Sequence, residues 1–215
     1  EEVFGVNSKK DLAEAEKINR KKIADELMEN GVTIIDPNRI DVRGKLICGK
    51  DVTIDVNTIF FGDVTLGDGV SVGPFTVISN STIGDETEIH SHSNIDEADI
   101  GLKCNIGPFA RIRPQTKVEE GARVGNFVET KKAVIGKSSK VNHLTYIGDA
   151  IIGEHTNIGA GTITCNYDGV NKHQTKIGDD SFVGTNSSLV APVTVGSNAY
   201  VAAGSVITKD VPDNA

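Results

Sequence analysis

Residues 135–159 read IGKSSKVNHLTYIGDAIIGEHTNIG, and an aliphatic residue, usually followed by glycine, returns there about every six positions. The spacing resumes over residues 177–207, which read IGDDSFVGTNSSLVAPVTVGSNAYVAAGSVI. A period of six fits neither the 3.6-residue period of an α-helix nor the two-residue period of a strand. It is typical of a parallel β-helix, in which three short strands make one coil of about 18 residues. Each coil then stacks its aliphatic side chains on those of the coil below.

The same ladder runs through the earlier part of the chain, with less regular first members at Ile40, Leu46 and Val52. Its later members are Val64, Val70, Ile83, Ile89, Ile95, Ile100, Ile106, Ile112, Val118 and Val124. Trp is absent and aromatic residues make up 5% of the chain, which suits a narrow aliphatic core. We therefore predict an all-β solenoid over residues 32–215, with about nine to ten coils and an irregular first coil as its cap.

A helix is predicted before the solenoid, over residues 8–31. Ser8 precedes Asp11 by three positions, as in an N-terminal cap, and Asn30-Gly31 supplies a stop. The segment is mostly charged and has only a thin apolar stripe, so we expect a solvated linker rather than a membrane-bound helix.

The composition indicates which kinds of binding partner and which cellular compartment are to be expected. A formal charge of -8 and a pI near 5.1 argue against nucleic acid or an anionic membrane as a partner. No apolar run is long enough to span a membrane. Cys48, Cys104 and Cys165 are odd in number and lack metal-site spacing, so we expect free thiols in a reducing, cytoplasmic compartment.

The ladder is interrupted at two places. The step from Val124 to Ile135 is eleven residues instead of twelve, and the step from Ile158 to Ile177 is nineteen. The second break predicts an extruded loop over residues 164–176. Insertions of this kind bulge from one face of a solenoid and often carry binding sites.

Four cations lie near the first break. Arg111 and Arg113 stand about one coil before Lys131 and Lys132, so stacking would bring the two pairs together. One interpretation is a phosphate-binding site, because arginine grips phosphate with two hydrogen bonds and lysine binds it as a point charge. The other is a salt-bridged scaffold, in which these cations pair with the stacked carboxylates of Glu119, Glu120 or Glu129.

The histidines also allow two interpretations. His143, on a predicted corner, has the ordinary pKa range of a general base near neutral pH, although a lone histidine is more often a surface residue. His90 and His92 are two positions apart, but a zinc site would need a third ligand, so a solvated face is the better interpretation.

Four stretches carry a family resemblance: residues 107–114 (GPFARIRP), 124–132 (VGNFVETKK), 143–149 (HLTYIGD) and 157–169 (NIGAGTITCNYDG). Together they resemble the acetyltransferase half of the bacterial bifunctional UDP-N-acetylglucosamine pyrophosphorylase / glucosamine-1-phosphate N-acetyltransferase. The resemblance implies a left-handed β-helix that assembles as a homotrimer. It also implies that residues 1–7 are the tail of a nucleotidyltransferase domain, where a magnesium site would lie.

The implied activity is transfer of the acetyl group of acetyl-CoA to the amine of glucosamine-1-phosphate, on the route to UDP-N-acetylglucosamine and the cell wall. His143 would be the general base. The sugar phosphate would contact Arg113, Lys131, Tyr146, Asn157 and Lys172. Acetyl-CoA would contact Ala160, Asn166, Tyr167, Thr185 and Ala203, with a backbone N–H stabilising the developing oxyanion.

The resemblance implies no metal for this half of the enzyme. Two departures stand out: Thr185 occupies a position where serine is expected, and the chain ends at Ala215, before the C-terminal helix and basic tail of the family. Two other functions compete on the same scaffold, a γ-type carbonic anhydrase with zinc between subunits and a non-catalytic trimerisation stalk.

Overall fold

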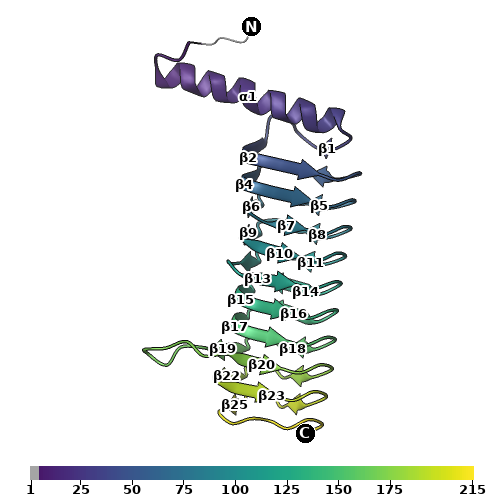
Figure 1. Ribbon diagram of the computed structural model, residues 1–215, viewed down its shortest axis with the longest axis vertical. Helices are drawn as coiled ribbons and strands as arrows, with labels where there is room; N and C mark the ends of the chain where they lie inside the picture. The colour runs from purple at the N-terminus through teal and green to yellow at the C-terminus, as the bar shows by residue number, and fades with distance from the viewer. Residues whose placement is uncertain (1–4) are drawn as a thin grey trace.

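The computed structural model describes residues 5–215, which form one helix followed by a single stack of β-coils (Figure 1). The fold class is confirmed as a parallel β-solenoid. Of the segment 1–7 predicted as a domain tail, the first four residues lie outside the described residues. Within residues 5–215, the structure has no helix with the length and apolarity that a membrane crossing requires.

The helix α1 (Lys9–Glu29) lies across the N-terminal end of the stack (Figure 1). The Ser8 hydroxyl accepts a hydrogen bond from the Asp11 N–H at 3.1 Å, so the predicted cap is confirmed. Ala24 is buried against the first coils, and Ile23 and Leu27 pack beside it. The helix therefore rests on the stack by one narrow side and is otherwise solvated.

The first face of the prism is a parallel sheet of ten strands, one from each coil. In spatial order they are β1 (Thr33–Ile34), β3 (Thr53–Ile54), β5 (Ser71–Val72), β8 (Glu88–Ile89), β11 (Asn105–Ile106), β14 (Arg123–Asn126), β16 (Lys140–His143), β18 (Asn157–Ile158), β21 (Phe182–Val183) and β24 (Tyr200–Val201).

The other two faces form a second, fifteen-stranded sheet, because four long strands bend around the corner between them. These are β2 (Ile40–Cys48), β4 (Thr58–Leu66), β15 (Glu129–Ile135) and β17 (Tyr146–Ile152). The second face also holds β6 (Val77–Ser79), β9 (Asn94–Asp96), β12 (Arg111–Ile112), β19 (Ile163–Cys165), β22 (Ser188–Val190) and β25 (Val206–Ile207). The third holds β7 (Thr82–Ile83), β10 (Ala98–Ile100), β13 (Thr116–Val118), β20 (Thr175–Ile177) and β23 (Val193–Val195).

The core is the predicted aliphatic ladder. Val124, Val141, Ile158, Val183 and Val201 follow one another in register on the first face, and all are buried. Buried hydroxyls beside the ladder donate to backbone carbonyls of the next coil: Thr87 to Gly101 (2.7 Å), Ser139 to Gly153 (2.6 Å) and Thr156 to Gly178 (2.7 Å). The interior is thus aliphatic along the faces and hydrogen-bonded at a corner.

The corner between the first and second faces carries a ladder of aromatic side chains. His92 stacks between Phe75 and Phe109, with ring centroids 4.9 and 4.7 Å away, and Phe127 follows at 5.3 Å from Phe109. We call these four residues the aromatic column. Its three phenylalanines are exposed, so the prism has an apolar edge along its middle coils.

Candidate functional site

Arg113 and Lys131 stand next to each other on the second face. Register between β12 and β15 pairs Ile112 with Thr130, and the Arg113 N–H donates to the Thr130 carbonyl at 2.9 Å. Ile112 and Thr130 are buried, so the following side chains, Arg113 and Lys131, point outward in adjacent coils. The predicted stacking of the two cations is confirmed.

The charges around this pair are partly compensated. Arg113 Nη1 lies 2.7 Å from Glu129 Oε1, and both side chains are about one third exposed, at 33% and 37%. Lys132 Nζ lies 3.6 Å from Asp149 Oδ1. The salt-bridged interpretation is therefore right for Arg113 through Glu129, while Glu119 and Glu120 pair with other lysines. Lys131 makes no ion pair within the described residues.

Lys131 is instead under the influence of another cation, Lys172. The pKa of Lys131 is lowered, first by the contact between its ammonium group and Lys172 and by the charge of that residue. Partial loss of water and the charge of Arg113 act in the same direction, and the carboxylate of Asp149 acts against them. Arg113, Lys131 and Lys172 thus form a group of cations, which we call the cation cluster. Such a cluster suits a dianion such as a phosphate monoester.

Lys172 comes from the extruded loop, whose bounds need correction. The sequence predicts a loop over residues 164–176, but β19 ends at Cys165 and β20 begins at Thr175, so the loop is 166–174. Thr164 points inward, accepting from the Gly148 N–H at 2.8 Å and donating to the Gly148 carbonyl at 3.0 Å. Thr164 and Thr175 continue the ladder with hydroxyl side chains, which a search for aliphatic residues does not find.

Asn166 and Tyr146 lie at the base of this loop. Asn166 Nδ2 donates to the buried carboxylate of Asp149 at 2.6 Å and so ties the loop to the body of the prism. The Tyr146 hydroxyl lies over Gly148, close to the Asn166 amide, because a Cβ built on Gly148 would meet both groups. Gly148 is the register partner of Lys131, so Tyr146 reaches the cation cluster.

His143 begins a second group of predicted residues, at the corner between the first and second faces. It is the register partner of Asn126, and its carbonyl accepts from the Gly161 N–H at 3.3 Å. Continued from the inward residues of the same strands, the register places His143, Ala160, Thr185 and Ala203 one below another. We call these four residues the corner column. The His143 side chain is exposed and makes no hydrogen bond within residues 5–215.

One predicted residue, Asn157, lies apart from the cation cluster. Asn157 lies on the first face between Lys140 and Phe182, whereas the cation cluster and Tyr146 lie on and beside the second face. Tyr167 is on the loop, where its hydroxyl donates to the Gly169 carbonyl at 2.6 Å. One chain therefore presents an open surface with only part of the predicted set.

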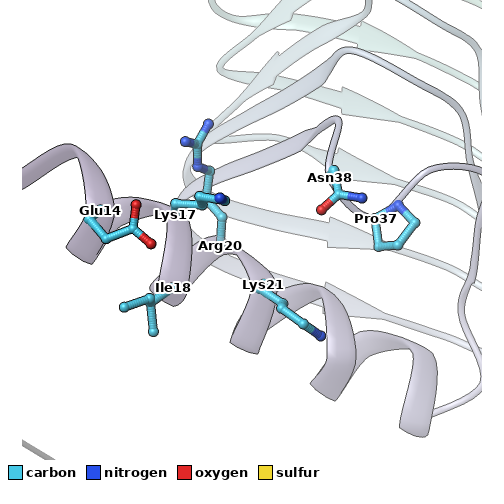
Figure 2. Close-up of a pocket in the computed structure, with 7 residues that line it drawn as sticks. All are labelled: Glu14, Lys17, Ile18, Arg20, Lys21, Pro37 and Asn38. Carbon is cyan, nitrogen blue, oxygen red and sulfur yellow. The ribbon is translucent and has the colours of Figure 1, made fainter.

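A hollow of about 360 Å³ lies elsewhere, between α1 and the start of the stack (Figure 2). Glu14, Lys17, Arg20 and Asn38 are among its lining residues. It is at the N-terminal end of the prism, whereas every predicted site residue lies from β12 onward. The candidate site lies instead where the charged and predicted residues converge, from β12 onward.

The histidine pair of the sequence does not form a site. His92 belongs to the aromatic column, and His90 Nε2 lies 3.7 Å from Glu88 Oε2. Across residues 5–215, no three His, Cys, Asp or Glu side chains gather in a way that would hold a metal ion.

The sequence analysis missed three residues that shape the candidate site, namely Asp149, Asp168 and His173. Asp149 occupies a corner with a positive φ of 47°, one coil after the corner at Lys132, so counting the ladder period would have placed it beside the cations. Asp168 Oδ2 and His173 Nε2 form a hydrogen bond within the loop, at 2.7 Å. No periodic signal exists inside an extruded loop, so these two residues could not be placed from the ladder.

Comparison with known proteins agrees with the fold. Residues 174–209 match the family described as "Bacterial transferase hexapeptide (six repeats)". Among solved structures, the chain resembles the UDP-N-acetylglucosamine acyltransferases of Arabidopsis and Campylobacter jejuni, with TM-scores of 0.61 and 0.58 and 18% identity to each. These likenesses cover 81% and 74% of this chain and 68% and 67% of the other chains, and at this identity they show the fold.

Sequence relatives are much closer. The chain is 58% identical over 212 residues to the bifunctional protein GlmU of Burkholderia vietnamiensis and 55% identical to that of Ralstonia pickettii. Each alignment covers 99% of this chain and 47% of the relative, so the chain spans about half the length of these proteins. Over the half that it spans, the chain is closely similar to bifunctional GlmU proteins.

Proposed function

We propose that this chain transfers the acetyl group of acetyl-CoA to the amine of glucosamine-1-phosphate, giving N-acetylglucosamine-1-phosphate for UDP-N-acetylglucosamine synthesis. The observation that carries the proposal is the cation cluster on the second face, with Tyr146 beside it and His143 at the adjoining corner. In this reading the cluster binds the phosphate, and Lys131 and Lys172 lose their mutual repulsion when the dianion lies between them.

The corner column would receive the coenzyme. Ala160, Thr185 and Ala203 have short side chains, so the edge below His143 is free of bulky groups. A thioester laid along this edge would place its carbonyl near the imidazole. The methyl group of Thr185, where serine is expected, would narrow the edge slightly.

The chemistry requires a neutral amine and a proton acceptor. The amine nitrogen attacks the thioester carbonyl, a C–N bond forms, and His143 takes the proton that the nitrogen must lose. When the C–S bond breaks, the thiolate of coenzyme A leaves and the proton of His143 neutralises the sulfur. An imidazole suits this exchange because its ordinary pKa lies near neutrality.

The proposal includes a homotrimer. Asn157 lies on another face than the cation cluster, so a complete set of predicted residues requires a second copy of the chain. The exposed aromatic column runs along the edge that leads to His143, which offers apolar surface to such a partner. The three free cysteines accord with a reducing compartment, and we place the reaction in the cytoplasm.

The decisive experiment measures thiol release from acetyl-CoA in the presence of glucosamine-1-phosphate. We expect turnover with this substrate and little with glucosamine-6-phosphate, whose phosphate lies at the other end of the sugar. Absence of thiol release with glucosamine-1-phosphate would refute the proposal. Zinc analysis of the purified protein addresses the carbonic anhydrase alternative, and calorimetry with acetyl-CoA addresses the non-catalytic stalk.

A further inference from the structure

The extruded loop is held in one conformation by its own hydrogen bonds. Tyr167 and Lys172 form an antiparallel β-bridge, and the Asp168 N–H donates to the Asn171 carbonyl at 3.1 Å. At the base, the His173 N–H donates to the Asn166 carbonyl at 2.8 Å. The loop is therefore a short hairpin that projects from the prism between β19 and β20 (Figure 1).

Asp168 is the centre of this hairpin. Its Oδ1 accepts from the N–H groups of Val170 and Asn171 at 2.8 and 2.6 Å, and its Oδ2 lies 2.7 Å from His173 Nε2. Hydrogen bonds from Asn171, from the His173 side chain and from Val170 lower the pKa of Asp168 to about 2. The carboxylate is thus ionised at neutral pH, and His173 must carry its proton on Nε2 to donate to it.

Lys172 immediately precedes His173 and pairs across the hairpin with Tyr167, next to Asn166. The Asn166 amide lies over Gly148, the register partner of Lys131, so the base of the hairpin stands beside Lys131, and Lys172 lowers the pKa of Lys131. Two ammonium groups repel each other, so a freely moving loop would carry Lys172 away into solvent. Asn166 anchors the base of the loop through Asp149, and the Asp168–His173 contact closes the turn beyond Lys172. Together these contacts oppose the repulsion.

We propose that Asp168 and His173 are positioning residues, which hold Lys172 against Lys131 so that the two lysines bind the phosphate of the substrate together. The inference rests on the proposed function, because it names the residues that prepare its phosphate site. Neither residue contacts the substrate in this arrangement, and both act through Lys172.

The first test compares the steady-state kinetics of His173→Leu and His173→Gln. Leucine removes the donor to Asp168, whereas the amide of glutamine restores an N–H near the place of Nε2. We expect His173→Leu to raise KM for glucosamine-1-phosphate about 5-fold to 20-fold, with KM for acetyl-CoA and kcat within about 2-fold. His173→Gln should recover most of the loss.

A double-variant cycle separates positioning from general damage. In a Lys172→Ala background, His173→Leu should cause no further rise in KM, because the residue that it positions is already absent. Gln174→Ala is the matched control, since this exposed loop side chain makes no hydrogen bond within residues 5–215 and should leave the kinetics unchanged. An equal effect of His173→Leu with and without Lys172, or equal effects on both substrates, overturns the inference.

A readout independent of turnover distinguishes this inference from the proposed function. The pKa of Lys131 can be followed by its rate of reaction with acetic anhydride between about pH 7 and pH 11, measured by mass spectrometry. Release of Lys172 in His173→Leu should raise the pKa of Lys131, and His173→Gln should not. If the protein does not acetylate the sugar but the pKa of Lys131 responds in this way, the proposed function is refuted and the positioning role of Asp168 and His173 stands. If the protein is active but neither KM nor the pKa of Lys131 responds, the positioning role is refuted.

Discussion

Lys131 and Lys172 place two like charges near each other on a protein whose net charge is negative. The native pKa of Lys131 is lowered, so between that value and its unfolded pKa the unfolded state binds more protons, and stability rises with pH there. Below this window both states are protonated, and the repulsion destabilises the native state in full. The charges that would bind the phosphate therefore lower the stability of the ligand-free native state.

Replacing Lys172 by methionine should consequently raise the thermal midpoint of the ligand-free protein at neutral pH. The gain should shrink at high salt, which screens exposed charges, and should also shrink as the pH rises through the window in which Lys131 loses its proton. Lys176→Met, an exposed lysine on β20, is the control. A midpoint for Lys172→Met at or below that of the control would contradict the repulsion.

His143 is a residue whose loss should affect rate rather than fold. Its side chain is exposed at a corner and lies outside the stacked core, so His143→Ala should unfold at the temperature of the parent. As the proposed general base it would act mainly in the transition state, and kcat should fall about 10² to 10⁴-fold with both KM values within a few-fold. The test is to measure steady-state kinetics from about pH 6 to 9 and thermal unfolding for both His143→Ala and the parent protein. A normally folded variant with more than a tenth of the parent kcat would show that His143 is not the base.

At the scale of elements, the middle of β17 joins the fold to the site. A Cβ on Gly148 would overlap the Tyr146 hydroxyl and lie 2.8 Å from Asn166 Nδ2. Gly148→Ala must therefore displace the tyrosine, the loop anchor or both, and such overpacking costs about 1 to 3 kcal/mol of stability. We also expect a raised KM for the sugar phosphate. Chemical denaturation of Gly148→Ala tests the loss of stability, and its kinetics test the rise in KM. If neither the free energy of unfolding nor KM changes, Tyr146 moves aside freely.

The strands and the loop also differ in how well they could be predicted from the sequence. A period of six fixes which residues point inward, so the coils, the face that each strand occupies and the neighbourhood of Arg113 and Lys131 could all be predicted. The ends of the loop could not, because Thr164 and Thr175 fill buried ladder positions with hydroxyl side chains in place of aliphatic ones. The position of Lys172 near Lys131 depends on bonds inside the loop, where no repeat constrains the chain.

At the scale of the whole molecule, the proposed homotrimer, in which the site is divided between faces of two chains, predicts complementation between impaired chains. Arg113→Ala and Asn157→Ala should each be impaired, yet a trimer assembled from both contains contacts at which an intact Arg113 meets an intact Asn157. Random mixing would make about a quarter of the sites complete. Unfolding the two variants together and refolding them should therefore restore activity that neither has alone. Separately refolded samples, combined afterwards, are the control, and no recovery in the co-refolded sample would place both residues in one chain's site.

The coils above β12 contain none of the predicted site residues, yet they share the register of those below. Each coil adds about 4.8 Å to the stack, so the number of coils before β12 sets the distance between α1 and the candidate site. Its length can change only in whole coils, because the loss of part of a coil would turn every later residue onto a different face. The distance between the helix and the candidate site therefore changes only in steps of one coil, and a chain can lengthen it without altering the sequence at either end.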